Sequence, residues 1–467
     1  MLCAFIRIVR APWVIGSFCL RRVWGWISRL TIAKDSQTPA TGACKNDIES
    51  DAAQHINAPK IGAATFDTDK FPSITEYEQG LAKKDFIDHL DLDAVCALAS
   101  QFNNGSKCRV VSKNNGSFNV CFFVEFDQGG PKWAVRVPIE PAAQDSWGKL
   151  LSEVTTLQYI ERNSHIPVPH VHAYGRDAKL CKNSSETHAF LIADFIPGEP
   201  LDKKLLVSTE ERCRKLFYSE LIDILAELRT LEFPALGSLV PDPSGRQQAI
   251  VGPVMSMTAA ILRLPPFPVL ASAKQYMDHQ LNLFSKFLMQ PSGGIALDEV
   301  RQELFALYGM EHVFHQVFTP PSWITGHDSL ETNKQMNLEF RQVLEEKSKT
   351  CGLCSLLERE WYSQPDAKDI PIGPTDVAFC AAHVLRRPAG VTDVFCDYFA
   401  ASKSEKSLED QISDFFEKRP SLALEAQRRV KHSERYASYL KEQGRYETDI
   451  DALLAASKAL KEKWGWS

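Results

Sequence analysis

The sequence lacks a large excess of either charge and lacks an apolar run long enough to cross a bilayer. Its 53 Lys and Arg residues stand against 59 Asp and Glu residues, a formal net charge of −6 at pH 7. That balance excludes a globally basic surface that would bind nucleic acid. The apolar run 11–20 has about half the roughly twenty residues that a membrane-spanning helix needs. We therefore expect no nucleic-acid partner and no transmembrane segment.

A cysteine framework is also missing. The 12 cysteines are scattered along the chain, which indicates a reducing compartment. One close pair exists, in Cys351-Gly352-Leu353-Cys354. A zinc or redox site would require a second pair or a thioredoxin-like context, and neither is visible. We expect two ordinary thiols in a loop, and no metal site.

The first 34 residues contain no Asp or Glu but several arginines and tryptophans. An Arg-rich, acid-free, amphipathic leader is typical of a mitochondrial presequence. A disordered basic leader, or a wrongly chosen start, is the equal alternative, and the expected location is then cytoplasmic. Residues 35–85 are mostly polar and irregular, which predicts a linker, with a helical run starting at Ile74.

What is present starts with a β-hairpin. The apolar run 118–126, the turn signal 127–130 and the β-rich run 132–139 predict two antiparallel strands. A polar loop, 112–117, precedes them and contains Asn115, Gly116 and Ser117. After them, residues 147–162 have helical spacing.

The order of these elements suggests a nucleotide-holding lobe. In kinases a glycine-containing loop covers the phosphates, and a strand cation is held by a glutamate on the next helix. Arg136 and Glu153 occupy those positions here, and arginine can keep the ion pair. A buried hairpin with a surface Arg–Glu pair is the alternative.

Further along, the chain reads as a buried strand followed by helices. The strand 189–196 is broken by Pro197-Gly198, and amphipathic patterns then predict helices at 210–231, 271–288, 297–314, 334–347, 376–386, 391–400 and within 402–464.

These segments resemble the fungal branch of aminoglycoside-phosphotransferase-like, choline-kinase-like proteins. The resemblance includes Pro197-Gly198-Glu199-Pro200-Leu201 and the segment 233–239 (Phe-Pro-Ala-Leu-Gly-Ser-Leu). The resemblance implies an α+β, bilobal protein-kinase-like fold. It has a small antiparallel-sheet lobe at 86–196, a helical lobe at 197–400 and a charged helical tail at 401–467. It also implies ATP, Mg²⁺ and a small-molecule hydroxyl acceptor. Asn115, Gly116, Ser117, Arg136 and Glu153 would hold the phosphates.

By the same resemblance, backbone groups from Asp194 to Ile196 would form a hinge that meets the adenine. A strand that simply ends in a turn is the alternative reading of these residues.

The catalytic loop that this family needs is missing. An acceptor-facing Asp, a metal-binding Asn and a second metal-binding Asp are required for phosphoryl transfer. They should fall between the helix ending near Phe314 and the phrase at 318–323, yet Gln316 and Val317 run directly into that phrase. Asp328 and Asn333 keep the Asp-to-Asn spacing, but a helix N-terminus with an Asp cap explains them as well.

Three functions therefore stay open. The first is a family member that is inactive because the loop and metal carboxylates are absent, either as a pseudoenzyme or through a missing exon. The second is a non-catalytic interaction or pseudokinase module that uses the helical lobe and tail. The third is a working small-molecule kinase that uses Asp328 and Asn333. The substrate and the oligomeric state do not follow from the sequence.

Overall fold

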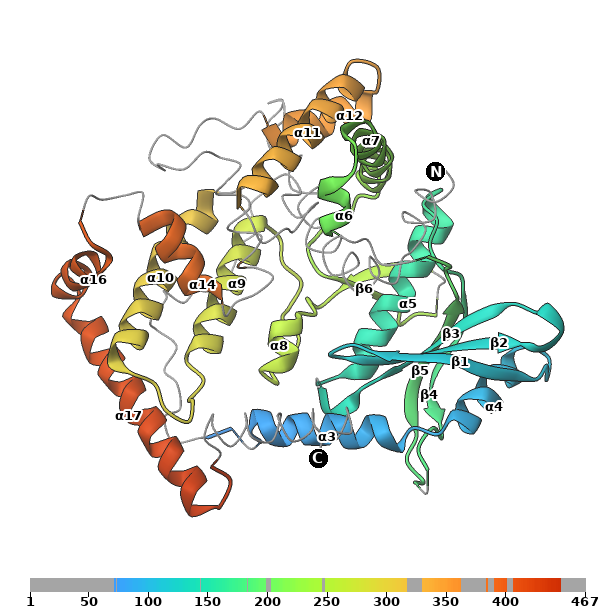
Figure 1. Cartoon of the computed structure of the whole chain (residues 1–467), viewed down its shortest axis with the longest axis horizontal. Helices are drawn as coiled ribbons and strands as arrows, with labels where there is room; N and C mark the ends of the chain where they lie inside the picture. Colours follow the sequence, from blue (N-terminus) through green and yellow to red (C-terminus); the bar gives the residue numbers. More distant parts are fainter. Residues whose placement is uncertain are drawn as a thin grey trace, which may run out of the picture. The chain divides into compact units, whose positions relative to one another are not determined.

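The computed structural model describes residues 71–72, 74–142, 144–182, 184–198, 203–245, 248–316, 330–362, 384, 390–400 and 406–446. These residues belong to two compact units (Figure 1). The first unit comprises 74–277 together with 330–362, and the second comprises 71–72, 278–316, 384, 390–400 and 406–446. The leader 1–34 and the segment 35–70 lie outside the described residues.

A five-stranded antiparallel sheet forms the centre of the first unit. The strands are β1 (Cys108–Asn115), β2 (Asn119–Phe126), β3 (Lys132–Pro138), β4 (Val171–Ala178) and β5 (His188–Asp194), in the spatial order β1-β2-β3-β5-β4. β2 and β3 pair antiparallel through the 3₁₀ turn Asp127–Gly129, so the predicted hairpin is confirmed. The predicted strand at 189–196 corresponds to β5, which ends at Asp194. The α+β class is confirmed.

Both faces of the sheet are covered, since β3 buries the side chains that it directs to each face. Val135 and Val137 pack in one apolar cluster with Val95 and Ala99 of α4 (Leu92–Phe102). Successive side chains of a strand point to opposite faces, so Arg136 lies on the other face. That face is covered by α5 (Ser146–Asn163), as Figure 1 shows.

β1 replaces most of the predicted polar loop, and there the prediction is wrong. Ser112 to Asn115 pair with Phe123 to Val120 of β2. β1 is an edge strand with one partner, and most of its side chains are exposed. A strand exposed in this way need not alternate apolar and polar residues, so periodicity could not reveal it.

Helix α3 (Glu76–His89) confirms the helical run expected from Ile74, at the end of the segment predicted as a linker. Thr75 caps it: its hydroxyl accepts from the Glu78 N–H at 3.2 Å, and the Glu78 carboxylate accepts from the Thr75 N–H at 2.8 Å. This reciprocal capping box fixes the helix start. The helix buries none of its residues completely, so its apolar spacing is a weak signal.

A helical part of the first unit packs around Tyr218, Phe340 and Trp361. It contains α6 (Lys203–Ser208), α7 (Glu211–Leu228), α11 (Leu330–Ser348) and α12 (Gly352–Tyr362), while the short hairpin β6 (Ser238–Pro241) and β7 (Ala249–Gly252) and helix α8 (Met257–Ile261) precede α11 in the chain. Two buried arginines tie these helices together. Arg214 of α7 binds the Glu339 carboxylate through Nε at 2.7 Å, and Arg229 binds Glu360 through Nη2 at 2.8 Å.

All the regular secondary structure that is described in the second unit is helical. It contains α9 (Ala273–Leu288, from Asp278 on), α10 (Leu297–Gln316), α14 (Val391–Val394), the π-helix Phe395–Ala400, α16 (Leu408–Glu417) and α17 (Pro420–Glu442). The helices predicted at 271–288, 297–314 and 391–400 are confirmed. Most of the predicted helix 376–386, and the tail beyond 446, lie outside the described residues.

α17 packs on α10 through a partly buried ion pair. Arg429 Nη2 donates to the Glu303 carboxylate at 2.6 Å and also to the Leu288 carbonyl. The charged tail is therefore packed on its apolar side along α17, with Leu422, Ala426 and Leu440 buried.

No helix within the described ranges is both long and apolar enough to cross a membrane.

Gly309 of α10 gives a test of the packing in the second unit. A Cβ there would overlap the ring of Phe395, which is itself held between Phe305 and Phe399. Replacing helical Gly with Ala usually stabilises by about 0.5–1 kcal/mol. We expect Gly309→Ala to destabilise instead, by about 1–3 kcal/mol through overpacking.

The matched control is Gly80→Ala, in exposed α3, where a Cβ meets no atom within 4 Å. This variant should raise or preserve the urea midpoint measured by circular dichroism, while Gly309→Ala lowers it. A higher midpoint for Gly309→Ala would contradict the packing described here.

Candidate functional site

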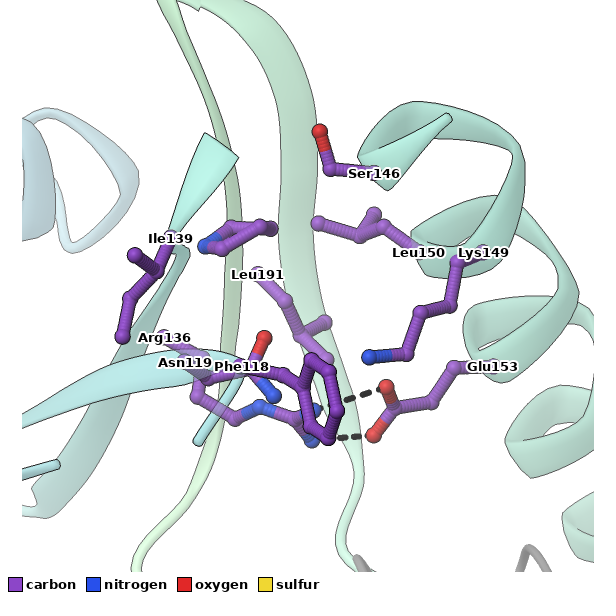
Figure 2. A pocket seen from close by; sticks show the side chains of 10 residues that line it. Phe118, Asn119, Arg136, Ile139, Ser146, Lys149, Leu150, Glu153 and Leu191 are labelled. Carbon is purple, nitrogen blue, oxygen red and sulfur yellow. Dashed lines mark hydrogen bonds and ion pairs between the residues drawn. The ribbon is translucent and has the colours of Figure 1, made fainter. Parts of the chain in front are cut away.

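A pocket lies between the end of β3 and the first turns of α5 (Figure 2). It has a volume of about 380 Å³, counted with its opening to solvent. The walls carry both apolar and charged side chains: Phe118, Asn119, Arg136, Pro138, Ile139, Ser146, Lys149, Leu150, Glu153 and Leu191. All of them come from the first unit.

The N-terminus of α5 is fixed locally, which sets the position of its lining residues. Asp145 adopts a left-handed conformation (φ 50°), and its Oδ1 accepts from the Gly148 N–H at 2.9 Å. A Cβ on Gly148 would lie 2.8 Å from the Asp145 carboxyl carbon, so this cap requires a glycine. Ser146, Lys149, Leu150 and Glu153 follow at spacings of three and four, which place them on one helix face.

Arg136 and Glu153 form the predicted ion pair. The guanidinium donates to both carboxylate oxygens, with Nη2 2.8 Å from Oε2 and Nη1 bound to Oε1. Arg136 is 7% exposed. Bidentate geometry of this kind adds directional specificity to the charge attraction. The pair therefore joins the central strand to the helix that covers it.

The charge balance at Arg136 is decided by its partners. Burial is the largest influence and opposes the charged guanidinium, but attraction to Glu153, then to Cys121, and the hydrogen bond to Glu153 exceed it. The pKa of Arg136 is therefore raised above its ordinary value. Cys121 faces Arg136 across the β2–β3 ladder, and burial raises the pKa of its thiol. We infer a permanently charged arginine beside a neutral thiol.

Two further polar groups complete the pocket. With its amide oriented to satisfy its neighbours, Asn119 accepts from Arg136 Nη2 at 3.0 Å and donates to the Phe118 carbonyl at 3.1 Å. The Lys149 ammonium lies 4.7 Å from the centre of the Phe118 ring, and Figure 2 shows it pointing toward the ion pair.

The lining carries two cations, Arg136 and Lys149, against one anion, Glu153. A surplus of positive charge in a partly closed pocket attracts anions. Its one carboxylate is engaged by Arg136, and neither a histidine nor a thiol is among the lining residues. These residues can bind an anion, but they offer no general base or nucleophile of the usual strength.

The predicted loop residues lie next to this pocket in the chain. Asn115 is the last residue of β1 and pairs with Val120. The Gly116 N–H donates to the Asn119 carbonyl at 3.0 Å, and a Cβ on Gly116 would meet open space. Ser117 then leads directly to Phe118, which lines the pocket. This tight turn closes the β1–β2 hairpin at the pocket end of the sheet.

The predicted hinge residues sit on the strand beside β3. Asp194 pairs with Trp133, three residues before Arg136. Its carboxylate is occupied: Oδ2 accepts from the His170 N–H at 3.0 Å, and Oδ1 lies 2.7 Å from His172 Nε2. Ile196 follows the strand and is half-buried.

Two backbone donors of this hinge are already used within the sheet. The N–H of Asp194 binds the His170 carbonyl at 3.0 Å, and that of Phe195 binds the Lys132 carbonyl at 3.1 Å. An adenine contact with residues 194–196 stays a prediction. It would have to use groups other than these two N–H donors.

Neither of the two lookalike catalytic residues is among the described residues that line this pocket. Asn333 lies in the helical backbone of α11, which confirms the helix expected at 334–347. Asp328 lies outside the described residues. Their catalytic role stays a prediction.

Sequence reasoning missed Phe118, Asn119, Ser146 and Lys149 as lining residues. For Lys149 a signal existed, because it stands four residues before Glu153 and so shares its helix face. Phe118 and Asn119 directly follow the predicted Ser117, and Ser146 begins the helix that carries Glu153, but the sequence does not show which way their side chains point.

Among the described residues, no group of three or more His, Cys, Asp and Glu side chains is placed to hold a metal ion. No family model matches this chain, and no curated protein matches it. The function is therefore inferred from the pocket.

The ion pair can be tested by replacing one partner and then both. Arg136→Met should cost about 3–5 kcal/mol of unfolding free energy, because it leaves Glu153, whose side chain is only 15% exposed, without its counterion. Arg136→Met with Glu153→Leu should cost less than the single change, since an apolar pair needs no counterion. Urea unfolding measures both free energies.

The matched control is Arg109→Met, which breaks the exposed pair between Arg109 and Glu125 of the same sheet, 2.9 Å apart. Its effect should be much smaller, because water screens exposed pairs. Equal losses for Arg109→Met and Arg136→Met would show that burial does not matter at Arg136.

Proposed function

We propose that the pocket at Arg136 and Glu153 holds the phosphates of a nucleotide, in a protein of the aminoglycoside-phosphotransferase-like kind. The protein binds the nucleotide but is inactive in phosphoryl transfer. The observation that carries the proposal is the buried, bidentate ion pair between a strand cation and a carboxylate of the following helix.

The order of the elements supports this proposal. The cation stands on the third strand of an antiparallel sheet, and the glutamate stands on the helix that follows that strand. Kinases use a strand cation and a helix glutamate in this order to hold ATP phosphates. The bilobal kinase-like fold is part of the proposal, with the sheet of the first unit as its nucleotide lobe.

The chemistry of the pocket suits phosphate oxygens. Arg136 Nη groups face Glu153 and Asn119, and Lys149 extends toward the same point, as Figure 2 shows. Phosphate bound here would meet two cations and the Ser146 hydroxyl at the start of α5. The apolar walls, Phe118, Ile139 and Leu191, would exclude water and strengthen those contacts.

A magnesium ion does not fit the lining residues in the same way. Mg²⁺ prefers carboxylate oxygens together with waters and phosphates, and the one carboxylate here is bound by Arg136. We derive no step through a metal. The acceptor-facing Asp and the metal ligands expected between Gln316 and Phe318 are missing from the sequence, which is why the proposed function stops at binding.

Nucleotide binding can be measured directly by isothermal titration calorimetry with ADP and ATP. Arg136→Ala should weaken binding by one to two orders of magnitude, roughly 1.5–3 kcal/mol for a lost charge-assisted contact. Lys149→Gln should weaken it in the same direction while leaving the ion pair intact. Arg109→Ala, which changes an exposed cation on β1, is the control.

Unchanged affinity in both pocket variants would refute the assignment of this pocket. Absence of any nucleotide binding by the unmodified chain would favour the interaction module instead.

Catalysis is tested separately by magnesium-dependent ATP turnover with small hydroxyl acceptors. We expect little or none, because loss of one positioned acid–base group already costs on the order of a hundredfold to ten-thousandfold in rate. Robust turnover that disappears in Asp328→Ala and Asn333→Ala would establish a working kinase. Turnover confined to a longer transcript with the loop would show a lost exon.

A further inference from the structure

The Cys351-Gly352-Leu353-Cys354 sequence lies at the beginning of a helix and not in the loop that the sequence suggested. α12 begins at Gly352, and the Cys351 carbonyl accepts from the Ser355 N–H at 3.0 Å. Cys351 is thus the residue that immediately precedes the helix, and Cys354 lies in its first turn. The Cys351 N–H binds the Lys347 carbonyl at 2.9 Å, which joins α12 to the end of α11.

The two thiols are neighbours with opposite environments. Cys354 is buried in the core formed by α7, α11 and α12, whereas Cys351 lies at the margin of that core and is half-buried. The backbone N–H of Cys354, then its thiol and the N–H of Leu353, donate to Cys351 and hold the pKa of that thiol below its ordinary value. Burial, followed by the contact with Cys351, raises the pKa of Cys354 to about 12.

Charged groups around the pair come from α7 and α11. Lys347 Nζ binds the Asp223 carboxylate at 2.7 Å and the Ser219 hydroxyl at 2.9 Å. Asp223 disfavours a thiolate at both cysteines, and Lys347 favours one at Cys354. Because Lys347 and Asp223 neutralise each other, the backbone N–H groups are the decisive influence on Cys351.

The outer side of the pair is accessible. A Cβ on Gly352 would meet no atom within 4 Å, and Leu353 is exposed. A small disulfide can therefore approach Cys351 past these two residues, while Cys354 remains covered from solvent.

We propose that Cys351 and Cys354 form a redox-active dithiol that exchanges with low-molecular-weight disulfides such as oxidised glutathione, with Cys351 as the attacking thiol and Cys354 as the resolving thiol. This activity is independent of the nucleotide pocket.

The exchange has two steps. The Cys351 thiolate attacks one sulfur of oxidised glutathione, which forms a mixed disulfide and releases one glutathione thiolate. The Cys354 thiol then attacks Cys351 Sγ and passes its proton to the second glutathione, which leaves as a thiol. Two protein thiols are oxidised to one disulfide, and one glutathione disulfide is reduced to two glutathione thiols.

The geometry permits this bond with a local adjustment. Residues three apart on a helix have Cβ atoms about 5–6 Å apart, and a disulfide needs roughly 3.5–4.5 Å. The first turn of α12 must tighten, next to Gly352, where space is open. Because the ring spans so few residues, it stabilises the fold little, so the bond should be readily reduced.

The first test uses the full unmodified chain, equilibrated with mixtures of reduced and oxidised glutathione. Trypsin cuts after Lys349 and Arg359, so peptide 350–359 carries both thiols and no other cysteine. After alkylation, mass spectrometry should find this peptide either doubly alkylated or two hydrogens lighter and unalkylated. The proportion should follow the glutathione ratio.

Single variants separate the two roles. Cys354→Ser and Cys354→Ala should each retain one glutathione on Cys351, because nothing resolves the mixed disulfide. Cys351→Ser should react with oxidised glutathione ~10-fold or more slowly, since the remaining thiol is buried and lacks the helix N-terminal contacts. Cys108→Ser, near Cys96 in the sheet region, should leave peptide 350–359 unchanged.

The proposal is overturned if the unmodified chain never forms the intrapeptide disulfide at any glutathione ratio. It is equally overturned if Cys351→Ser reacts as fast as Cys354→Ser. Nucleotide titration of the reduced chain decides the pocket separately, so failure of either proposal leaves the other identifiable.

Discussion

The structure depends above all on the need to neutralise one guanidinium inside the sheet unit. Arg136 lies on a strand buried on both faces, and an unpaired charge there would cost several kcal/mol. The carboxylate of Glu153 must therefore reach it, which fixes where α5 lies against the sheet. The cap at Asp145 and the close approach at Gly148 set the start of that helix.

Stability alone does not explain why residue 136 carries a charge. Replacement of a buried ion pair by apolar residues of similar volume is often neutral or stabilising, and Leu150 and Leu191 already line the pocket beside Arg136. An apolar residue at 136 would therefore suit the sheet. A charge at residue 136 is useful if it binds an anion. Lys149, on the same helix as Glu153, adds a second cation to the pocket.

The sequence predicted those parts in which pattern and burial agree. The apolar run 118–126 and the β-rich run 132–139 on either side of a turn signal identified β2 and β3, and element order identified the pairing of Arg136 with Glu153. β1 escaped because an exposed edge strand tolerates Ser112 to Asn115 without alternation. The pocket walls were also not predicted. The direction of the Phe118 side chain follows from a turn that is held by backbone hydrogen bonds, such as Gly116 to Asn119, and residue types do not predict these bonds.

The cysteine pair is a second feature that the sequence pattern alone did not predict. In the sequence, Cys351 and Cys354 lack the second pair or the thioredoxin-like context that indicates a redox motif. The structure places them at the start of a helix, which their spacing alone did not identify. Once α12 begins at Gly352, one thiol receives backbone N–H groups and the other enters the core. Identical side chains three residues apart thereby acquire different acidities, and this asymmetry lets one thiol attack while the other resolves.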